Sequence, residues 1–404
     1  MPDDPTSQPN PWRSRIVLLT LVHVVGTIGY TSVMTMAPVI RVDLNLNATQ
    51  VGSFMSAFYF ALTIGAIPAG AVADRIGVAI SLAVASMLMA AGAALFAVVE
   101  SYWPAVTATF VMGLGYALVN PATAKGVLSW FTAEHRATAM GVKQMGVPMG
   151  GLVASGFGAA IVFMPWRWAL WVTAGVTVIV GLIWWHMAER RTVGGGGLRA
   201  ALADLKSVIG NKNLAALNLA SVTFNAGQQS FATYLTLFLR DVAGASQPFA
   251  ALCVGLSQLT GASGRVFWAF ASDRFARGQR KGVLVGIMTT AAAVMFVATA
   301  VSPSWHAVVL AAMALILGAT VLAYAALLHT ICAEAVPPKL AGAAIGSNLF
   351  ATSLGGTAGP IIFGLVVDHG GGYGVAWAVV GGLVLIGAMM VAFGFRESRR
   401  FLAE

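Results

Sequence analysis

Residues 140–151 read MGVKQMGVPMGG, and residues 345–356 read IGSNLFATSLGG. The two stretches align without a gap, and each closes on a Gly-Gly pair. A second pair shows the same relation, because GAVADRIG at 70–77 matches WAFASDRF at 268–275. Self-similarity between the first and second parts of a chain indicates a duplicated structural unit. The sequence therefore predicts two related halves.

The composition places both halves in lipid. Of the 404 residues, 58% are hydrophobic and only 9% are charged, which leaves too few polar side chains to cover a soluble globule. The charged and Pro-rich interruptions separate about twelve apolar stretches of roughly 20 residues, the length of a membrane-spanning helix. They lack the alternation of barrel strands. We predict an all-α polytopic membrane protein with helices near 16–40, 51–73, 78–99, 104–130, 137–163, 168–187, 213–236, 248–271, 282–301, 305–330, 341–367 and 374–395.

A long polar interval in the middle of the chain separates the halves. It contains the glycine run at 194–197. We expect an N-terminal six-helix bundle over 1–190, a cytoplasmic linker over 191–212 and a C-terminal six-helix bundle over 213–404. Two halves of the same sense suit a carrier whose binding site lies between them and opens to each side in turn.

The distribution of basic residues predicts the orientation. Lysine and arginine accumulate on the cytoplasmic side of membrane proteins, and with an inside N-terminus the opposite side holds only Arg41, Arg167 and Arg240. The net charge of +9 is then a topology signal and requires no nucleic acid partner. The first apolar run is too long for a signal peptide. We expect a monomer in a bacterial-type inner membrane, with both termini cytoplasmic.

Taken together, several short motifs resemble those of the major facilitator superfamily over essentially the whole chain. They are the loop residues Gly70, Asp74, Arg75 and Gly77, their counterparts Gly264, Arg265, Asp273 and Arg274, the pair Gly113 and Gly115, and Trp166-Arg167-Trp168. The resemblance implies a twelve-helix fold and secondary transport. It also implies a cytoplasmic gate formed by Asp74, Arg75, Asp273 and Arg274, in which an acid faces the positive end of a helix in the opposite half. The alternative is that these loop charges only fix the topology.

Other positions depart from the family pattern. Val78 and Ala79 stand where the loop usually has a basic pair, and Thr109 stands where proton-coupled drug exporters have an arginine. The Gly-Pro signature of their fifth helix is altered to Val147-Pro148. These departures argue against drug/proton antiport.

Three basic residues, Lys125, Lys143 and Arg265, fall inside predicted spans, whereas the carboxylates fall near span ends. A charged side chain at mid-bilayer costs at least about 2.5–3.5 kcal/mol, so buried cations without buried anions favour a site completed by an anionic ligand. We predict that Lys143 and Arg265 bind the substrate, and that Lys125 extends to the cytoplasmic surface. An interhelical role for Lys143 and a gate role for Arg265 are the alternatives.

Neutral polar residues and two histidines complete the predicted site. Helical spacing groups them on faces, which gives as further substrate-binding candidates Tyr30, Asn225, Gln228, Gln229, Gln258 and Asn348. Helix–helix hydrogen bonding is the alternative for each of them. His23 and His329 are the candidates for proton coupling. No metal site and no cofactor is expected.

These observations predict a secondary active transporter of a small organic anion, a mono- or dicarboxylate. It would work by rocker-switch alternating access with proton symport or anion exchange, and uptake is favoured over export. One alternative is an exporter of hydrophobic or zwitterionic compounds, suggested by the many Met, Phe and Trp residues; another is a membrane receptor. The sequence has no HExxH, GxSxG or phosphate-binding glycine motif, so we do not expect an enzyme.

Overall fold

The computed structural model describes residues 12, 14–188, 208, 210–275, 279–337 and 340–397, and all regular structure in these residues is helical. The first half contains α1 (Arg15–Thr35), α2 (Ala37–Asp43), α3 (Ala48–Ile76), α4 (Val78–Ala97), α5 (Tyr102–Trp130), η2 (Ala133–His135), α6 (Arg136–Gln144), α7 (Gly146–Ala160) and α8 (Trp166–His186). The second contains α10 (Lys212–Asp241), α11 (Gln247–Arg274), α12 (Arg280–Ala298), α13 (Ala307–Val321), α14 (Tyr324–Glu334), α15 (Ala341–His369), α16 (Gly372–Met389) and the π-helix η4 (Met390–Gly394).

Each predicted span corresponds to one helix or to two consecutive helices. The fifth span divides into α6 and α7 because Pro148 has no N–H to donate to the carbonyl of Gln144, where α6 ends. The tenth span divides at Leu322 and Ala323 into α13 and α14. The predicted linker lies almost entirely outside the described residues, so the domain boundaries remain predictions.

Eight of the described helical segments are long and apolar enough to cross a membrane, or nine with the bent pair in α3. The helices α10 and α11 have the length of a span but not the apolarity, because they contain Asn, Gln, Ser and Thr residues. The polar face of such a helix lies against protein or a solvated space rather than lipid. The chain is thus an all-α, multi-pass membrane protein.

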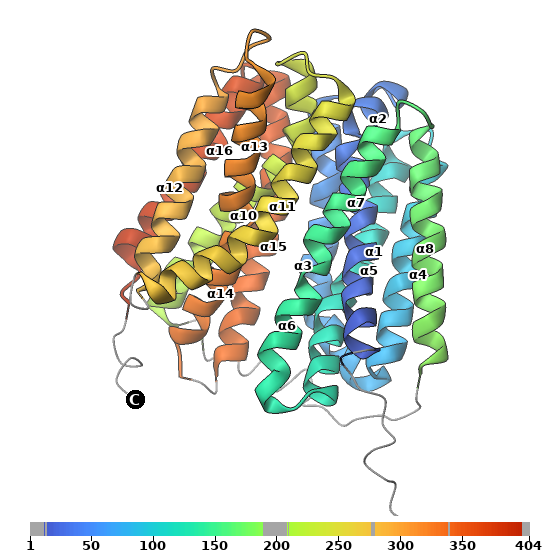
Figure 1. The fold of residues 1–404 in the computed structure, drawn as a ribbon, viewed down its shortest axis with the longest axis vertical. Coiled ribbons are helices and arrows are strands. Elements are labelled where there is room, and N and C mark those ends of the chain that lie inside the picture. Colours follow the sequence, from blue (N-terminus) through green and yellow to red (C-terminus); the bar gives the residue numbers. More distant parts are fainter. Residues whose placement is uncertain are drawn as a thin grey trace, which may run out of the picture.

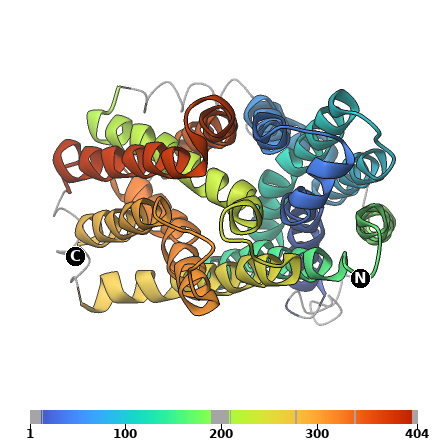
Figure 2. The same ribbon diagram turned by 90° about the horizontal axis from the view of Figure 1, so that it is seen from above.

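The helices form two bundles that lie side by side (Figure 1; Figure 2). Between the bundles, α3 packs on α15 and α7 packs on α11. The second glycine of each repeated Gly-Gly pair permits one of these crossings: a Cβ on Gly151 would lie 2.5 Å from Cδ of Gln258, and a Cβ on Gly356 would lie 2.4 Å from Cδ1 of Tyr59. Small residues allow helices to approach closely in this way. The duplicated motif therefore builds the interface between the halves.

The two ends of the molecule differ in how the bundles meet. At the end that contains α2, Arg41 forms an ion pair with Asp241, and Asp368 accepts hydrogen bonds from the backbone N–H groups of Ala48 (3.1 Å) and Thr49 (2.8 Å). These contacts join the halves and cap the positive N-terminus of α3. At the end that contains α6, no hydrogen bond between the halves occurs among the described residues. The bundles are therefore fastened to each other at the α2 end.

Candidate functional site

Arg265 lies on α11, about two turns beyond the crossing residue Gln258. Gly264 lets α11 approach the next helix pair closely, since its Cβ would lie 2.9 Å from the carbonyl oxygen of Ala319. The break between α13 and α14 leaves the Leu322 carbonyl outside both helices, and Nε of Arg265 donates to it at 3.1 Å. The two terminal nitrogens of the guanidinium have no hydrogen-bond partner within the described chain. Arg265 is half-buried and presents an unoccupied planar fork.

Several tyrosines lie within electrostatic range of this fork. Arg265 lies near enough to interact electrostatically with Tyr30, Tyr59, Tyr116 and Tyr324, four of the seven tyrosines in the chain. The first three belong to the opposite half, so the fork lies where the two bundles face each other. None of these electrostatic neighbours is a carboxylate. A charged fork with phenol groups around it and no acid nearby can bind the carboxylate of a ligand through two hydrogen bonds.

Tyr30, from the first half, is the predicted site residue that the structure brings to Arg265, together with the histidine His329. The tyrosines on α3, α5 and α14 were not predicted. Tyr116 and Asn120 are four residues apart, as are Tyr59 and Thr63, but neither spacing was used in the prediction. The chain has only seven tyrosines, so a tyrosine inside a predicted span could have been counted as a candidate site residue.

Among the other predicted binding residues on α10 and α11, Asn225 bonds to a neighbouring helix and Gln229 bonds within α10. Asn225 donates from Nδ2 to the carbonyl of Thr352 at 2.7 Å, and Gln229 donates to Oδ1 of Asn225 at 3.1 Å. Gln258 fills the space beside Gly151. Gln228 is half-buried. These polar groups fix the helices that bound the site.

Lys143 lies within the first half. Its Nζ donates to Oγ1 of Thr123 at 2.9 Å, and the side chain is only 2% exposed. The same hydroxyl is 3.1 Å from Nε2 of His23, which is fully buried. In this conformation Lys143 and Arg265 therefore have different surroundings: one is enclosed by its own bundle and the other faces the opposite bundle.

Asn348, the repeat counterpart of Lys143, is also fully buried. Its Nδ2 donates to Oδ1 of Asn218 at 3.1 Å and to Oγ of Ser221 at 2.6 Å. These bonds tie α15 to α10 within the second half. The pair of repeated positions thus points inward in both bundles.

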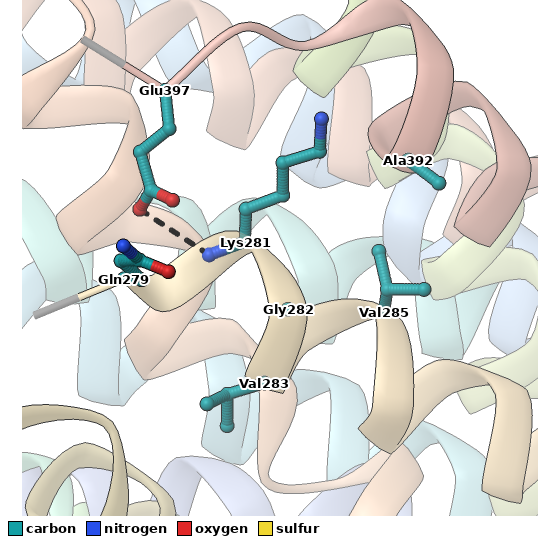
Figure 3. A pocket seen from close by; sticks show the side chains of 7 residues that line it. All are labelled: Gln279, Lys281, Gly282, Val283, Val285, Ala392 and Glu397. Atoms are coloured by element: carbon teal, nitrogen blue, oxygen red, sulfur yellow. Dashed lines mark hydrogen bonds between the residues drawn. The ribbon is translucent and has the colours of Figure 1, made fainter. Parts of the chain in front are cut away.

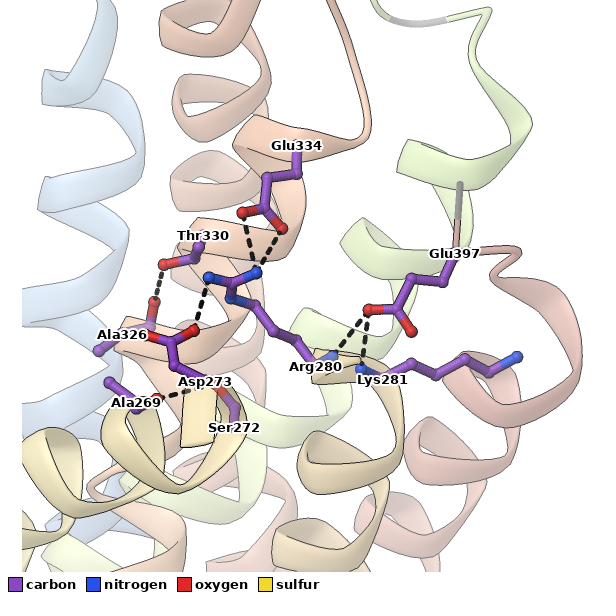
Figure 4. Close-up of polar contacts among 9 residues, drawn as sticks. All are labelled: Ala269, Ser272, Asp273, Arg280, Lys281, Ala326, Thr330, Glu334 and Glu397. Atoms are coloured by element: carbon purple, nitrogen blue, oxygen red, sulfur yellow. Dashed lines mark hydrogen bonds and ion pairs between the residues drawn. The ribbon is translucent and has the colours of Figure 1, made fainter. Parts of the chain in front are cut away.

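The residues predicted to form a gate are bound within their own halves. Lys125 forms an ion pair with Asp74 at 2.9 Å, so its charge has a protein partner. Asp273 accepts from Arg280 at 2.9 Å, and Arg280 also pairs with Glu334 at 3.0 Å (Figure 4). Arg75 and Arg274 are exposed. Neither aspartate contacts the opposite half in the described residues.

Two pockets lie beside α12 in the second half, and neither is lined by Arg265 or by the tyrosines near it. One pocket is lined by the first turns of α12 and by the end of the described chain. Its lining includes Gln279, Lys281, Ala392 and Glu397 (Figure 3). It is open and shallow, and Glu397 uses its carboxylate to cap the N-terminus of α12. The candidate site is therefore the region around Arg265.

Comparison with known proteins gives relatives over nearly the full length. The chain is 24% identical to the probable L-galactonate transporter of Escherichia coli (strain K12), over 95% of this chain and 89% of that protein. It is 24% identical to the hexuronate transporter of Bacillus subtilis (strain 168), over 93% of both chains. The probable sulfoacetate transporter of Cupriavidus necator is 23% identical, over 93% of this chain and 92% of that protein. All three are named as transporters.

Solved structures show the same fold. A bacterial homologue of the human lysosomal transporter Spinster, in an inward-facing and occupied conformation, matches with a TM-score of 0.78 at 18% identity, over 97% of this chain and 100% of that chain. A nucleoside transporter matches with a TM-score of 0.78 at 15% identity, over 94% of this chain and 100% of that chain. The family model described as Major Facilitator Superfamily matches residues 19–360 and 267–403. The chain belongs to the Major Facilitator Superfamily.

Proposed function

We propose that this protein carries small organic anions, of the sugar-acid class, across a bacterial inner membrane. The observation that supports it most directly is the fork of Arg265, whose terminal nitrogens have no partner among the described residues and which has no acid among its electrostatic neighbours. A sugar acid would place its carboxylate on this fork and its hydroxyl groups among the tyrosines. The relatives, which are named as a probable L-galactonate transporter, a hexuronate transporter and a probable sulfoacetate transporter, support an acidic substrate.

Alternating access follows from the two ends of the interface. The described basic residues concentrate at the α6 end, which we assign to the cytoplasm on the basis of the positive-inside rule. The contacts of Asp368 and Arg41 then close the external side, and the site opens to the cytoplasm. In the opposite state the bundles rock so that the α6 ends meet. We expect Asp74 and Asp273, with Arg75 and Arg274, to form the contacts that hold that state.

Transport into proteoliposomes tests the proposal. We expect uptake of labelled galactonate and glucuronate by the wild-type protein, and no uptake of the corresponding neutral sugars. A hydrogen bond to a charged group is worth about 1.5–3 kcal/mol, so Arg265→Lys, which keeps the charge but loses the fork, should lower kcat/KM about tenfold to a hundredfold. Arg265→Ala should remove detectable uptake.

Arg240 offers a matched control, because it is exposed and lies at the far end of α10. Arg240→Ala should transport at the wild-type rate. Transport of sugar acids by Arg265→Ala with unchanged affinity would refute the role of Arg265. A wild-type protein that transports neutral sugars and ignores the acids would refute the substrate class.

A further inference from the structure

A second group of polar side chains is buried inside the first half, away from the fork of Arg265. Lys143 on α6, Thr123 on α5 and His23 on α1 meet at one hydroxyl oxygen, with exposures of 2%, 0% and 0%. Both the Lys143 Nζ and the His23 Nε2 lie within hydrogen-bond distance of Thr123 Oγ1, at 2.9 Å and 3.1 Å. The function proposed above does not use this cluster as a substrate contact.

The hydrogen bonds of the cluster can be counted. Thr123 donates its hydroxyl proton to the carbonyl of Val119 at 2.7 Å, so its oxygen accepts from both Lys143 and the Nε2–H of His23. Nδ1 of His23 is then a buried acceptor, and it has no partner. A protonated lysine has three donors, and the structure gives Lys143 one acceptor. The cluster is therefore poorly suited to hold more than one positive charge.

No acid balances this charge. The titratable side chain that faces the cluster from α5 is Tyr116, whose ring lies 6.3 Å from that of His23. The α7 helix presents Gly146, whose Cβ would lie 2.7 Å from that of His23. The only ionisable residues on α8 are Arg167 and His186, at its two ends. Across the described parts of the helices packed around it, the cluster has no carboxylate neighbour.

The second half provides an internal comparison. A Cβ on Gly150 would lie 2.5 Å from the carbonyl oxygen of Val24. A Cβ on its counterpart Gly355 would lie 2.0 Å from the carbonyl oxygen of Val222. The residues preceding these valines are His23 and Ser221. In the second half Ser221 accepts from Asn348, the counterpart of Lys143. The same junction is therefore made by neutral groups in one half and by two titratable groups in the other.

We propose that Lys143 and His23 bind one exchangeable proton, bridged by Thr123, and form the proton-coupling site of anion symport. An N–H bond forms at one of the two nitrogens when a proton arrives from water, and it breaks when that proton returns to water on the other side. Two positive charges repel in this dry cluster, so only one proton is held. The proposal rests on the anion transport proposed above.

The route of coupling is electrostatic. Tyr116 contacts His23 and also Tyr30, at 6.0 Å between ring centroids, and it lies within electrostatic range of Arg265. An anion bound at Arg265 offsets the positive charge of the guanidinium and so favours a proton on the cluster. By thermodynamic reciprocity, the proton favours the anion to the same extent. Anion and proton then cross together.

The double variant His23→Ser with Lys143→Asn tests this directly, because it gives the first half the junction that the second half already has. In proteoliposomes we expect the wild-type protein to accumulate labelled sugar acid when the outside is more acidic. The double variant should lose this accumulation while its exchange of internal for external sugar acid, without a gradient, stays within about threefold of wild type. Lys212→Asn, at an exposed lysine, is the matched control and should behave as wild type.

A binding measurement gives a second readout. When galactonate is added to purified protein in weak buffer, the wild type should take up close to one proton for each anion bound, and the double variant none. If the double variant does not fold, Thr123→Val is measured in its place, with Thr109→Val as the control; Thr109 is equally buried on α5 and bonds only to its own helix.

The outcomes separate the two proposals. If the wild type binds no sugar acid, the proposed function fails. If it exchanges sugar acids but neither takes up a proton nor responds to the gradient, the proton site alone is refuted. Gradient-driven accumulation by the double variant would also refute it.

Discussion

Arg265 and Lys143 are both basic residues inside the membrane, one in each half, yet their surroundings are opposite. Arg265 donates one hydrogen bond, from Nε to the Leu322 carbonyl. Its other guanidinium nitrogens lie within electrostatic range of tyrosines of the other bundle. Lys143 is 2% exposed and bonds to a hydroxyl of its own bundle. The difference teaches that a buried charge without a protein acid has two distinct uses. An open fork can receive an anion, whereas for the enclosed amine we propose the exchange of a proton.

Ligand affinity should separate the two residues most strongly. Arg265→Ala removes charge-assisted hydrogen bonds worth about 1.5–3 kcal/mol each, so we expect the Kd for galactonate to rise by about a hundredfold or more. Lys143→Met, measured at a pH where the cluster of the wild type is neutral, should change the Kd less than about threefold. Isothermal titration of the purified proteins measures both. Equal losses in the two variants would remove the distinction.

The stability of the protein should depend on Thr123 more than on Lys143. Thr123→Val leaves the buried Lys143 and His23 donors without their acceptor, and an unsatisfied buried polar group costs about 1–3 kcal/mol. Its Tm should therefore fall clearly below that of the wild type. Lys143→Met should be neutral or stabilising, because an apolar side chain of similar length replaces a poorly compensated buried charge. A lower Tm for Lys143→Met than for Thr123→Val would contradict this assignment.

The pH dependence of anion binding sharpens the comparison further. At low pH the cluster holds its proton, and its positive charge favours the anion; as the pH rises the proton leaves and the affinity falls. An allosteric coupling of about 1–3 kcal/mol is typical, so we expect a fall of about fivefold or more. The double variant His23→Ser with Lys143→Asn should have a flat profile. A wild-type affinity that rises with pH would have the wrong sign.

The smallest effect is expected at the tyrosine between the two sites. Tyr116→Phe keeps the ring that packs near His23 and Tyr30 and removes only the hydroxyl near Arg265. One neutral hydrogen bond is worth about 0.5–1.5 kcal/mol, which limits the loss of affinity to about tenfold. Tyr102→Phe, whose hydroxyl bonds to Ser53 within the first half, is the control and should leave the affinity unchanged.

Much of the fold could be predicted from composition and periodicity. Apolar length determines where helices cross a bilayer, and a twelve-span prediction corresponds to the observed helices within several residues. The breaks were less predictable: Pro148 is a visible cause for the division of α6 from α7, whereas no proline lies at Leu322 or Ala323. That second break supplies the carbonyl that holds Arg265, so part of the site depends on local structure that the pattern does not encode.

The sequence by itself determined the helical class and the polarity of the helices, the duplication of the halves, the family and the position of Lys143 and Arg265 away from the acids along the chain. These properties depend on composition and spacing along the chain. Only the tertiary structure decided which cation faces the opposite bundle, that Lys125 pairs with Asp74, and that four tyrosines gather around Arg265. The reason is that spacing fixes the face of a helix on which a side chain lies, while the packing of neighbouring helices, here set by close glycine contacts, fixes what that face meets.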